Sequence, residues 1–145
     1  MNYIRYGIVF LAVALGAAIL INLLNTRVDN ALGSGAQLMV PAMIAALIEG
    51  QQFARKAKVK PNSTQAWGFT WTATLIATAL NVALAFLAGG IAPEFGKLAI
   101  AEALSQQFLV LLGLYAGGYL VFNRIFVGIG AGNQLSLMRS RGEIE

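Results

Sequence analysis

Long apolar stretches alternate with short polar or basic segments along the chain. They cover residues 6–24, 34–53, 66–87 and 106–126. Each is close to the ~20 residues that an α-helix needs to cross a ~30 Å hydrocarbon core. The pattern predicts an all-α, integral membrane four-helix bundle, a single domain over residues 1–145. We expect the first stretch to be an uncleaved span rather than a signal peptide, because its apolar run continues to Leu24.

The composition agrees with a membrane location. Only 11% of the residues are charged, against 58% hydrophobic, and the mean hydropathy is +0.71. A soluble domain has about 25% charged residues. The chain has no cysteine and no histidine, and therefore lacks thiolates, the commonest general base and the usual transition-metal ligand. We expect no catalytic residue, no cofactor, no metal and no enzymatic activity.

The cations are distributed unevenly between the predicted loops. Eight of the ten Lys and Arg residues lie at the N-terminus, in the 55–60 segment or after the fourth stretch, while only Arg27 and Lys97 lie on the other side. The positive-inside rule then places both termini in the cytoplasm. The net charge of +4 therefore indicates anionic lipid rather than nucleic acid as the partner. The expected headgroup contacts are Arg55, Lys56, Lys58 and Lys60.

Glu49 is the sharpest candidate for a functional residue. It lies about one helical turn inside the predicted membrane boundary, where a carboxylate is costly. It shares one helical stripe with Ala42, Ala45, Gln52 and Lys56, so we expect it to face protein. Two interpretations are open. Glu49 either binds a proton or cation in transport, or is a structural carboxylate paired with Lys56 or Arg124.

A polar stripe follows the third stretch at intervals of four, four and three residues: Thr70, Thr74, Thr78 and Asn81. It either lines a polar path or makes hydrogen bonds between helices. Leu75 and Phe86 lie on the opposite face, which we expect to meet lipid. Trp67 and Trp71 occupy the place of an interfacial aromatic belt.

Glycine and proline mark three further points. Pro41 either begins the second helix or kinks a longer one. In the fourth stretch Gly113 and Gly117 form a GxxxG pattern, which predicts close packing with a second copy or with another helix of the same chain. After Arg124 we expect a tail that contains Gly128, Gly130 and Gly132.

The block from Ser34 to Trp67 shows a small-residue entry, a P-x-M-x-A-A-like run, G-x-x-F, a basic stretch, a proline and a tryptophan. The residues that carry this pattern are Ser34, Gly35, Pro41, Met43, Ala45, Ala46, Gly50, Phe53, Pro61 and Trp67. The block resembles a family of short four-span bacterial inner-membrane proteins with no established activity. That family usually has an arginine where this chain has Lys60. The resemblance implies the topology and the bacterial inner membrane, and not a mechanism.

Two classes of function remain. The favoured hypothesis is a non-enzymatic inner-membrane protein with an accessory, interaction, membrane-stress or immunity role. The alternative is a small homo-oligomeric transporter or channel for an ion or small solute, which uses Glu49 and the Thr70/Thr74/Thr78/Asn81 stripe. The expected partners are membrane lipids and either further copies of the chain or a larger membrane complex.

Overall fold

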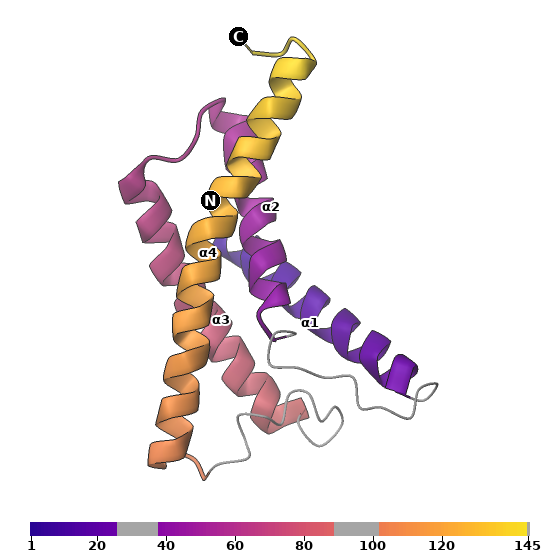
Figure 1. Cartoon of the computed structure of the whole chain (residues 1–145), viewed down its shortest axis with the longest axis vertical. Helices are drawn as coiled ribbons and strands as arrows, with labels where there is room; N and C mark the ends of the chain where they lie inside the picture. Colours follow the sequence, from indigo (N-terminus) through magenta and orange to yellow (C-terminus); the bar gives the residue numbers. More distant parts are fainter. Residues whose placement is uncertain (26–37, 89–101, 145) are drawn as a thin grey trace.

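The computed structural model contains four α-helices (Figure 1). They are α1 (Tyr3–Asn25), α2 (Val40–Ala57), α3 (Ser63–Ala88) and α4 (Gln106–Ser140). The structure describes residues 1–25, 38–88 and 102–144, without the side chains of residues 24 and 25. No strand occurs in these ranges, so the all-α prediction is confirmed for them.

Among the described residues, three helices are long and apolar enough to cross a membrane: Tyr3–Leu23 of α1, Ser63–Ala88 and Gln106–Ser140. The helix α2 is not among them, because its 18 residues include Glu49, Arg55 and Lys56. The first residues of the second expected span, 34–37, lie outside the described ranges. The helix α2 is thus more polar than the other three helices.

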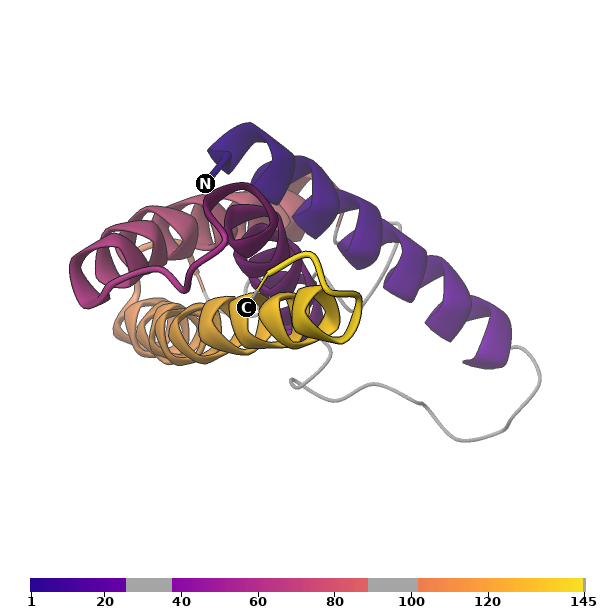
Figure 2. The same cartoon turned by 90° about the horizontal axis from the view of Figure 1, so that it is seen from above.

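The helices α2 and α4 run in the same direction, whereas α3 runs the opposite way (Figure 1). At one end of the α2–α4 contact, the Met39 side chain lies against Gly118, and further along Leu47 lies against Gly130. Phe86, near the end of α3, contacts Phe108, near the start of α4, so these two helices run antiparallel. The C-terminal half of α1 diverges from the other helices (Figures 1 and 2).

The helix α2 begins where proline permits. Pro41 lies in the first turn of α2, so it starts the described helix rather than kinking it. Backbone N–H groups in the first turn have no acceptor within the helix, so the N–H that proline lacks costs no hydrogen bond there. The helix ends at Ala57, and the next residue, Lys58, adopts a left-handed φ of 58° and donates its N–H to the Ala54 carbonyl. Asn62 and Gln65 then cap α3 reciprocally, with N–H to side-chain oxygen distances of 2.8 and 3.1 Å. The basic link between α2 and α3 is consequently short and ordered at both ends.

The helix α4 is longer than predicted. The glycine-containing segment that we expected as a tail after Arg124 is helical, since α4 continues to Ser140. Tertiary packing outweighs the low helix propensity of glycine here. Gly130 and Ala131 are buried, and Ala131 and Leu135 form a small apolar cluster with Ala54 of α2. The extension of α4 therefore pairs with the polar C-terminal half of α2.

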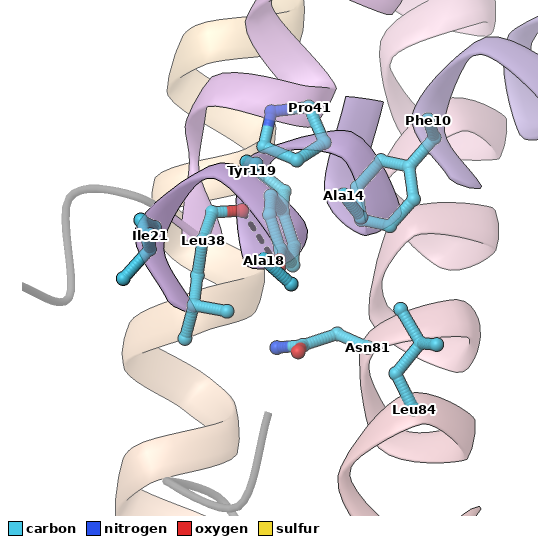
Figure 3. Close-up of a pocket in the computed structure, with 10 residues that line it drawn as sticks. Phe10, Ala14, Ala18, Ile21, Leu38, Pro41, Asn81, Leu84 and Tyr119 are labelled. Atoms are coloured by element: carbon cyan, nitrogen blue, oxygen red, sulfur yellow. Dashed lines mark hydrogen bonds between the residues drawn. The ribbon is translucent and has the colours of Figure 1, made fainter. Parts of the chain in front are cut away.

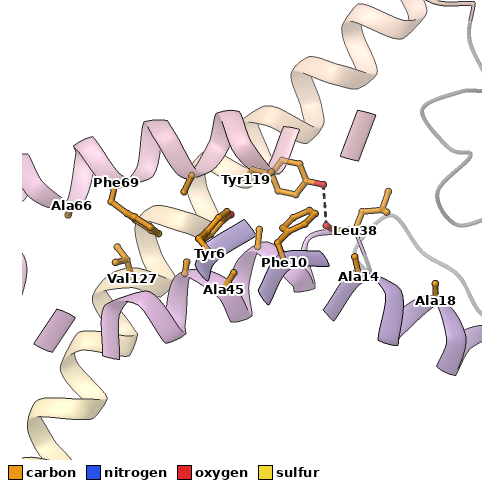
Figure 4. Close-up of a cluster of buried hydrophobic side chains, with 14 residues drawn as sticks. Tyr6, Phe10, Ala14, Ala18, Leu38, Ala45, Ala66, Phe69, Tyr119 and Val127 are labelled. Atoms are coloured by element: carbon orange, nitrogen blue, oxygen red, sulfur yellow. Dashed lines mark hydrogen bonds between the residues drawn. The ribbon is translucent and has the colours of Figure 1, made fainter. Parts of the chain in front are cut away.

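Large aromatic side chains and alanines form the core (Figure 4). Tyr6 packs edge-on against Phe69, with ring centroids 5.7 Å apart, and Phe10 packs edge-on against Tyr119 at 6.0 Å. Such edge-to-face pairs are favourable aromatic arrangements. Alanines of α2 and α3 face these rings, so the helix backbones approach closely and leave room for the aromatic side chains between them.

Candidate functional site

The Glu49 carboxylate is held by the start of α1. Arg5 donates from Nε to Oε1 at 2.5 Å and from an Nη to Oε2 at 2.9 Å. The backbone N–H of Asn2 donates to Oε2 at 2.8 Å. Glu49 is completely buried, whereas the Arg5 side chain retains 32% exposure. We call this group of Asn2, Arg5 and Glu49 the carboxylate clamp; it joins α1 to α2 through a bidentate, charge-assisted pair.

The clamp confirms that Glu49 faces protein, but the expected ion partners were wrong. Lys56 is exposed, and the Arg124 guanidinium lies over the Trp67 ring, 5.4 Å from its centroid. The reason is the position of α1. Its first turn packs beside α2 and brings Arg5 to the same level as Glu49. Arg5 and Glu49 each lie near the predicted cytoplasmic boundary of their helix, and this shared depth was the signal for their pairing.

The polar stripe of α3 faces the core, as predicted, and hydrogen bonds occupy its first half. Thr70 donates back to the Ala66 carbonyl at 2.8 Å. Thr74 accepts from the Asn123 side chain at 3.4 Å, and Asn123 in turn accepts from the Tyr6 hydroxyl at 2.8 Å. This network ties α1, α3 and α4 together. Asn123 is buried at its centre. The sequence reasoning did not select it, although an amide in an otherwise apolar stretch was the available signal.

In the second half of the stripe, two polar side-chain atoms lack hydrogen-bond partners. Asn81 is 2% exposed, and its Nδ2 has no hydrogen-bond partner among the described residues; the same holds for Thr78 Oγ1. Asn81 borders a small apolar cavity with Phe10, Leu38 and Tyr119 (Figure 3). There the Tyr119 hydroxyl donates to the Leu38 carbonyl at 3.3 Å.

Glu49 and Asn81 are not brought together. Glu49 and Arg5 are both absent from the lining of the Asn81 cavity, and Tyr6 lies on α1 between Arg5 and Phe10, which lines it. The two candidate elements of a transport path thus occupy separate parts of the described chain.

Gly113 and Gly117 lie on an open face. Both are exposed, and a Cβ added to either would meet nothing within 4 Å in the described residues. They therefore do not bring another described helix close. Instead they border an outward-facing groove of about 480 Å³ between α3 and α4, which also includes Thr74, Thr78, Leu112 and Ala116. We call it the α3–α4 groove.

The closest helix contact lies elsewhere, at Gly50 and Gly130. A Cβ at Gly50 would overlap the Val127 carbonyl, and one at Gly130 would overlap the Leu47 carbonyl. The sequence reasoning did not select this pair. Its signal was the spacing of small residues every four positions along α2: Ala42, Ala46, Gly50 and Ala54, all of them buried.

The predicted headgroup cations Arg55, Lys56, Lys58 and Lys60 are all exposed, as are Trp67 and Trp71. Among the described residues, no group of three or more His, Cys, Asp or Glu side chains forms a metal site.

Comparison of the chain with family models, curated proteins and solved structures finds no match.

Proposed function

We propose that this chain is a non-enzymatic membrane protein that acts by association, and that the α3–α4 groove receives a helix of a second copy of the chain. The observation that carries the proposal is the open GxxxG face. Gly113 and Gly117 have no neighbour where a Cβ would lie, and small residues of this spacing permit close helix contacts in membranes. Thr78 also lines the groove, and its buried hydroxyl oxygen has no hydrogen-bond partner among the described residues.

The carboxylate clamp favours association over transport. Glu49 accepts hydrogen bonds at both carboxylate oxygens from groups of the same chain. A transported cation or proton would have to compete with the bidentate Arg5 pair in a buried position. Removing a partner from a buried pair is strongly unfavourable. The clamp is better suited to fixing the angle between α1 and α2, and hence the shape that a partner meets.

The test compares native mass in a mild detergent for the wild type, Gly117→Leu and Gly16→Leu. Gly16 is the matched control, because it is also exposed on an apolar helix and a Cβ there also meets nothing within 4 Å. We expect the wild type and Gly16→Leu to migrate as assemblies larger than the 15.3 kDa monomer. Gly117→Leu should be monomeric with unchanged thermal stability. Monomeric wild type, or an assembly that persists in Gly117→Leu, would contradict the proposal.

The second candidate, a homo-oligomeric transporter, rests on the unpartnered polar atoms of Thr78 and Asn81. Two copies joined at the α3–α4 groove would bring two Thr78 hydroxyls close together. Ion or proton flux into vesicles separates the candidates. Flux that disappears in Glu49→Gln, without any change in thermal stability, would favour transport. Absence of flux in both proteins, with lowered stability of the variant, supports the association role and a structural Glu49.

A further inference from the structure

Lys60 and Arg124 border one groove that contains no acidic residue. The groove has a volume of about 510 Å³ and lies between the α2–α3 link and α4. Pro61, Gly128 and Asn133 also line it. The described carboxylates are engaged or distant: Glu49 pairs with Arg5, Glu143 lies 3.9 Å from Arg141, and Glu102 precedes the other end of α4.

Trp67 fixes the position of Arg124. The guanidinium carbon lies 5.4 Å from the centroid of the ring, which is a cation–π distance. The Nε atom of Arg124 is buried and has no hydrogen-bond partner in the part of the chain that the structure describes. Arg124 forms no ion pair with a described carboxylate, and it lines the groove. Phosphate oxygens match the planar edge of a guanidinium bidentately.

Small residues leave room for a ligand between the cations. A Cβ added at Gly128 would meet nothing within 4 Å, and one added at Gly132 would lie 3.7 Å from the Lys60 ammonium nitrogen. At these two glycines the wall of the groove is backbone of α4, and the Lys60 ammonium lies over Gly132. A headgroup-sized anion can approach both cations without displacing a side chain of α4.

The groove lies where the apolar part of α4 ends. No charged residue occurs from Gln106 to Asn123, and at 1.5 Å per residue this segment is about 27 Å long, close to the hydrocarbon thickness. Arg124 is the first cation after it. Ile125 and Ile129, which remain 47% and 42% exposed, flank the groove. The site thus combines two cations, an interfacial tryptophan and an apolar flank suited to acyl chains.

We propose that this groove is a specific binding site for the phosphate of an anionic phospholipid headgroup, with Arg124 and Lys60 as its ligands. The proposal gives Arg124, which lies in α4 outside the basic loop, a role in lipid binding. It also distinguishes Lys60 from the other exposed cations of that loop, which lie outside the groove. Its basis is charge and position, so it does not depend on the proposed association role.

The test is native mass spectrometry of the full chain in detergent, titrated with phosphatidylglycerol or phosphatidylcholine. Each lost cation should weaken phosphatidylglycerol binding about fivefold, so Lys60→Gln/Arg124→Gln should bind about 25-fold more weakly than wild type. The matched control, Arg55→Gln/Lys58→Gln, removes the same charge from exposed positions outside the groove and should bind like wild type. Lys60→Gln alone, an exposed loop substitution, should show the fivefold loss even if the double variant fails to fold.

Three results would overturn the proposal. Equal losses in the groove variant and its control would show a diffuse charge effect. No preference for phosphatidylglycerol over phosphatidylcholine would show that the headgroup charge is not recognised. Saturable binding of inorganic phosphate by the wild type, without binding of phosphatidylglycerol, would make this a site for a free anion.

Discussion

Replacing Gly50 by alanine should destabilise the protein although it improves helix propensity. In a helix interior, alanine is favoured over glycine by about 1 kcal/mol. At this position, however, the new Cβ would overlap the Val127 carbonyl oxygen and lie 3.0 Å from the Ala131 nitrogen. These are backbone atoms of α4, so no rotamer change relieves the overlap, and α2 and α4 must separate.

The expected magnitude follows from that separation. A gap of ~0.5–1 Å forfeits about a quarter to a half of the dispersion energy of the atoms that face each other. Overpacking of this kind costs about 1–3 kcal/mol. Because the overlap falls on backbone atoms, we take the upper part of this overpacking cost and subtract the gain of about 1 kcal/mol in helix propensity. The net loss is then about 2 kcal/mol, or roughly 5–10 °C in the midpoint of thermal unfolding for a chain of this size.

Thermal unfolding in detergent, followed by circular dichroism, measures the effect. Gly16→Ala is the control, because its Cβ meets nothing within 4 Å and only the propensity gain should remain. Gly130→Ala, which addresses the same crossing from α4, should behave like Gly50→Ala. The double variant should lose less than the sum, because the first substitution has already separated the helices. If Gly50→Ala is as stable as Gly16→Ala, the close crossing of α2 and α4 does not exist.

Two further predictions concern the clamp and the topology. Glu49→Gln should lower the free energy of unfolding by about 2–3 kcal/mol, less than the loss of a fully buried pair because Arg5 is partly exposed. Adding Arg5→Gln to this variant should recover part of the loss, whereas adding Lys56→Gln should recover none. The reverse result would make Lys56 the ion partner, as expected from the sequence. Single cysteines at Ser63 and Ser140 should resist an impermeant maleimide added to spheroplasts, because both follow or adjoin cation-rich segments. Labelling at Ser63 would refute a cytoplasmic location of the α2–α3 link, and labelling at Ser140 would refute it for the end of α4.

Periodicity predicted the faces of the helices well. The stripe of Ala42, Ala45 and Glu49 is buried, and the polar stripe of α3 faces the core, while Leu75 is 70% exposed. These assignments depend only on the 3.6-residue repeat, which is a local property of the chain. The existence and order of the helices followed from the length of the apolar stretches, and the start of α2 from the position of Pro41.

The partners across the core could not be predicted in this way. Arg5 reaches Glu49, and Asn123 reaches Tyr6, only because of the angles at which the helices cross. Those angles depend on which small residues permit close approach, and the chain offers several glycine pairs. The pair chosen from the GxxxG pattern, Gly113 and Gly117, is open, whereas the contact forms at Gly50 and Gly130. Several small-residue pairs are locally equivalent, and tertiary packing decides between them.

The pairing of α2 with α4 has a consequence for biosynthesis. Unlike α1, α3 and α4, α2 is not among the described helices that are long and apolar enough to cross a membrane, and its Glu49 is costly in lipid until it is paired. Arg5 is already synthesised when Glu49 emerges and can neutralise it at once. The α4 surface that covers Gly50 arrives only later, since it lies at Val127 and Ala131, about 80 residues further along the chain. At ~5–20 residues per second the delay is on the order of 4–16 s. During that interval the nascent chain exposes a half-polar helix held by one ion pair, which makes it the stage at which a membrane insertase or quality-control protease would act.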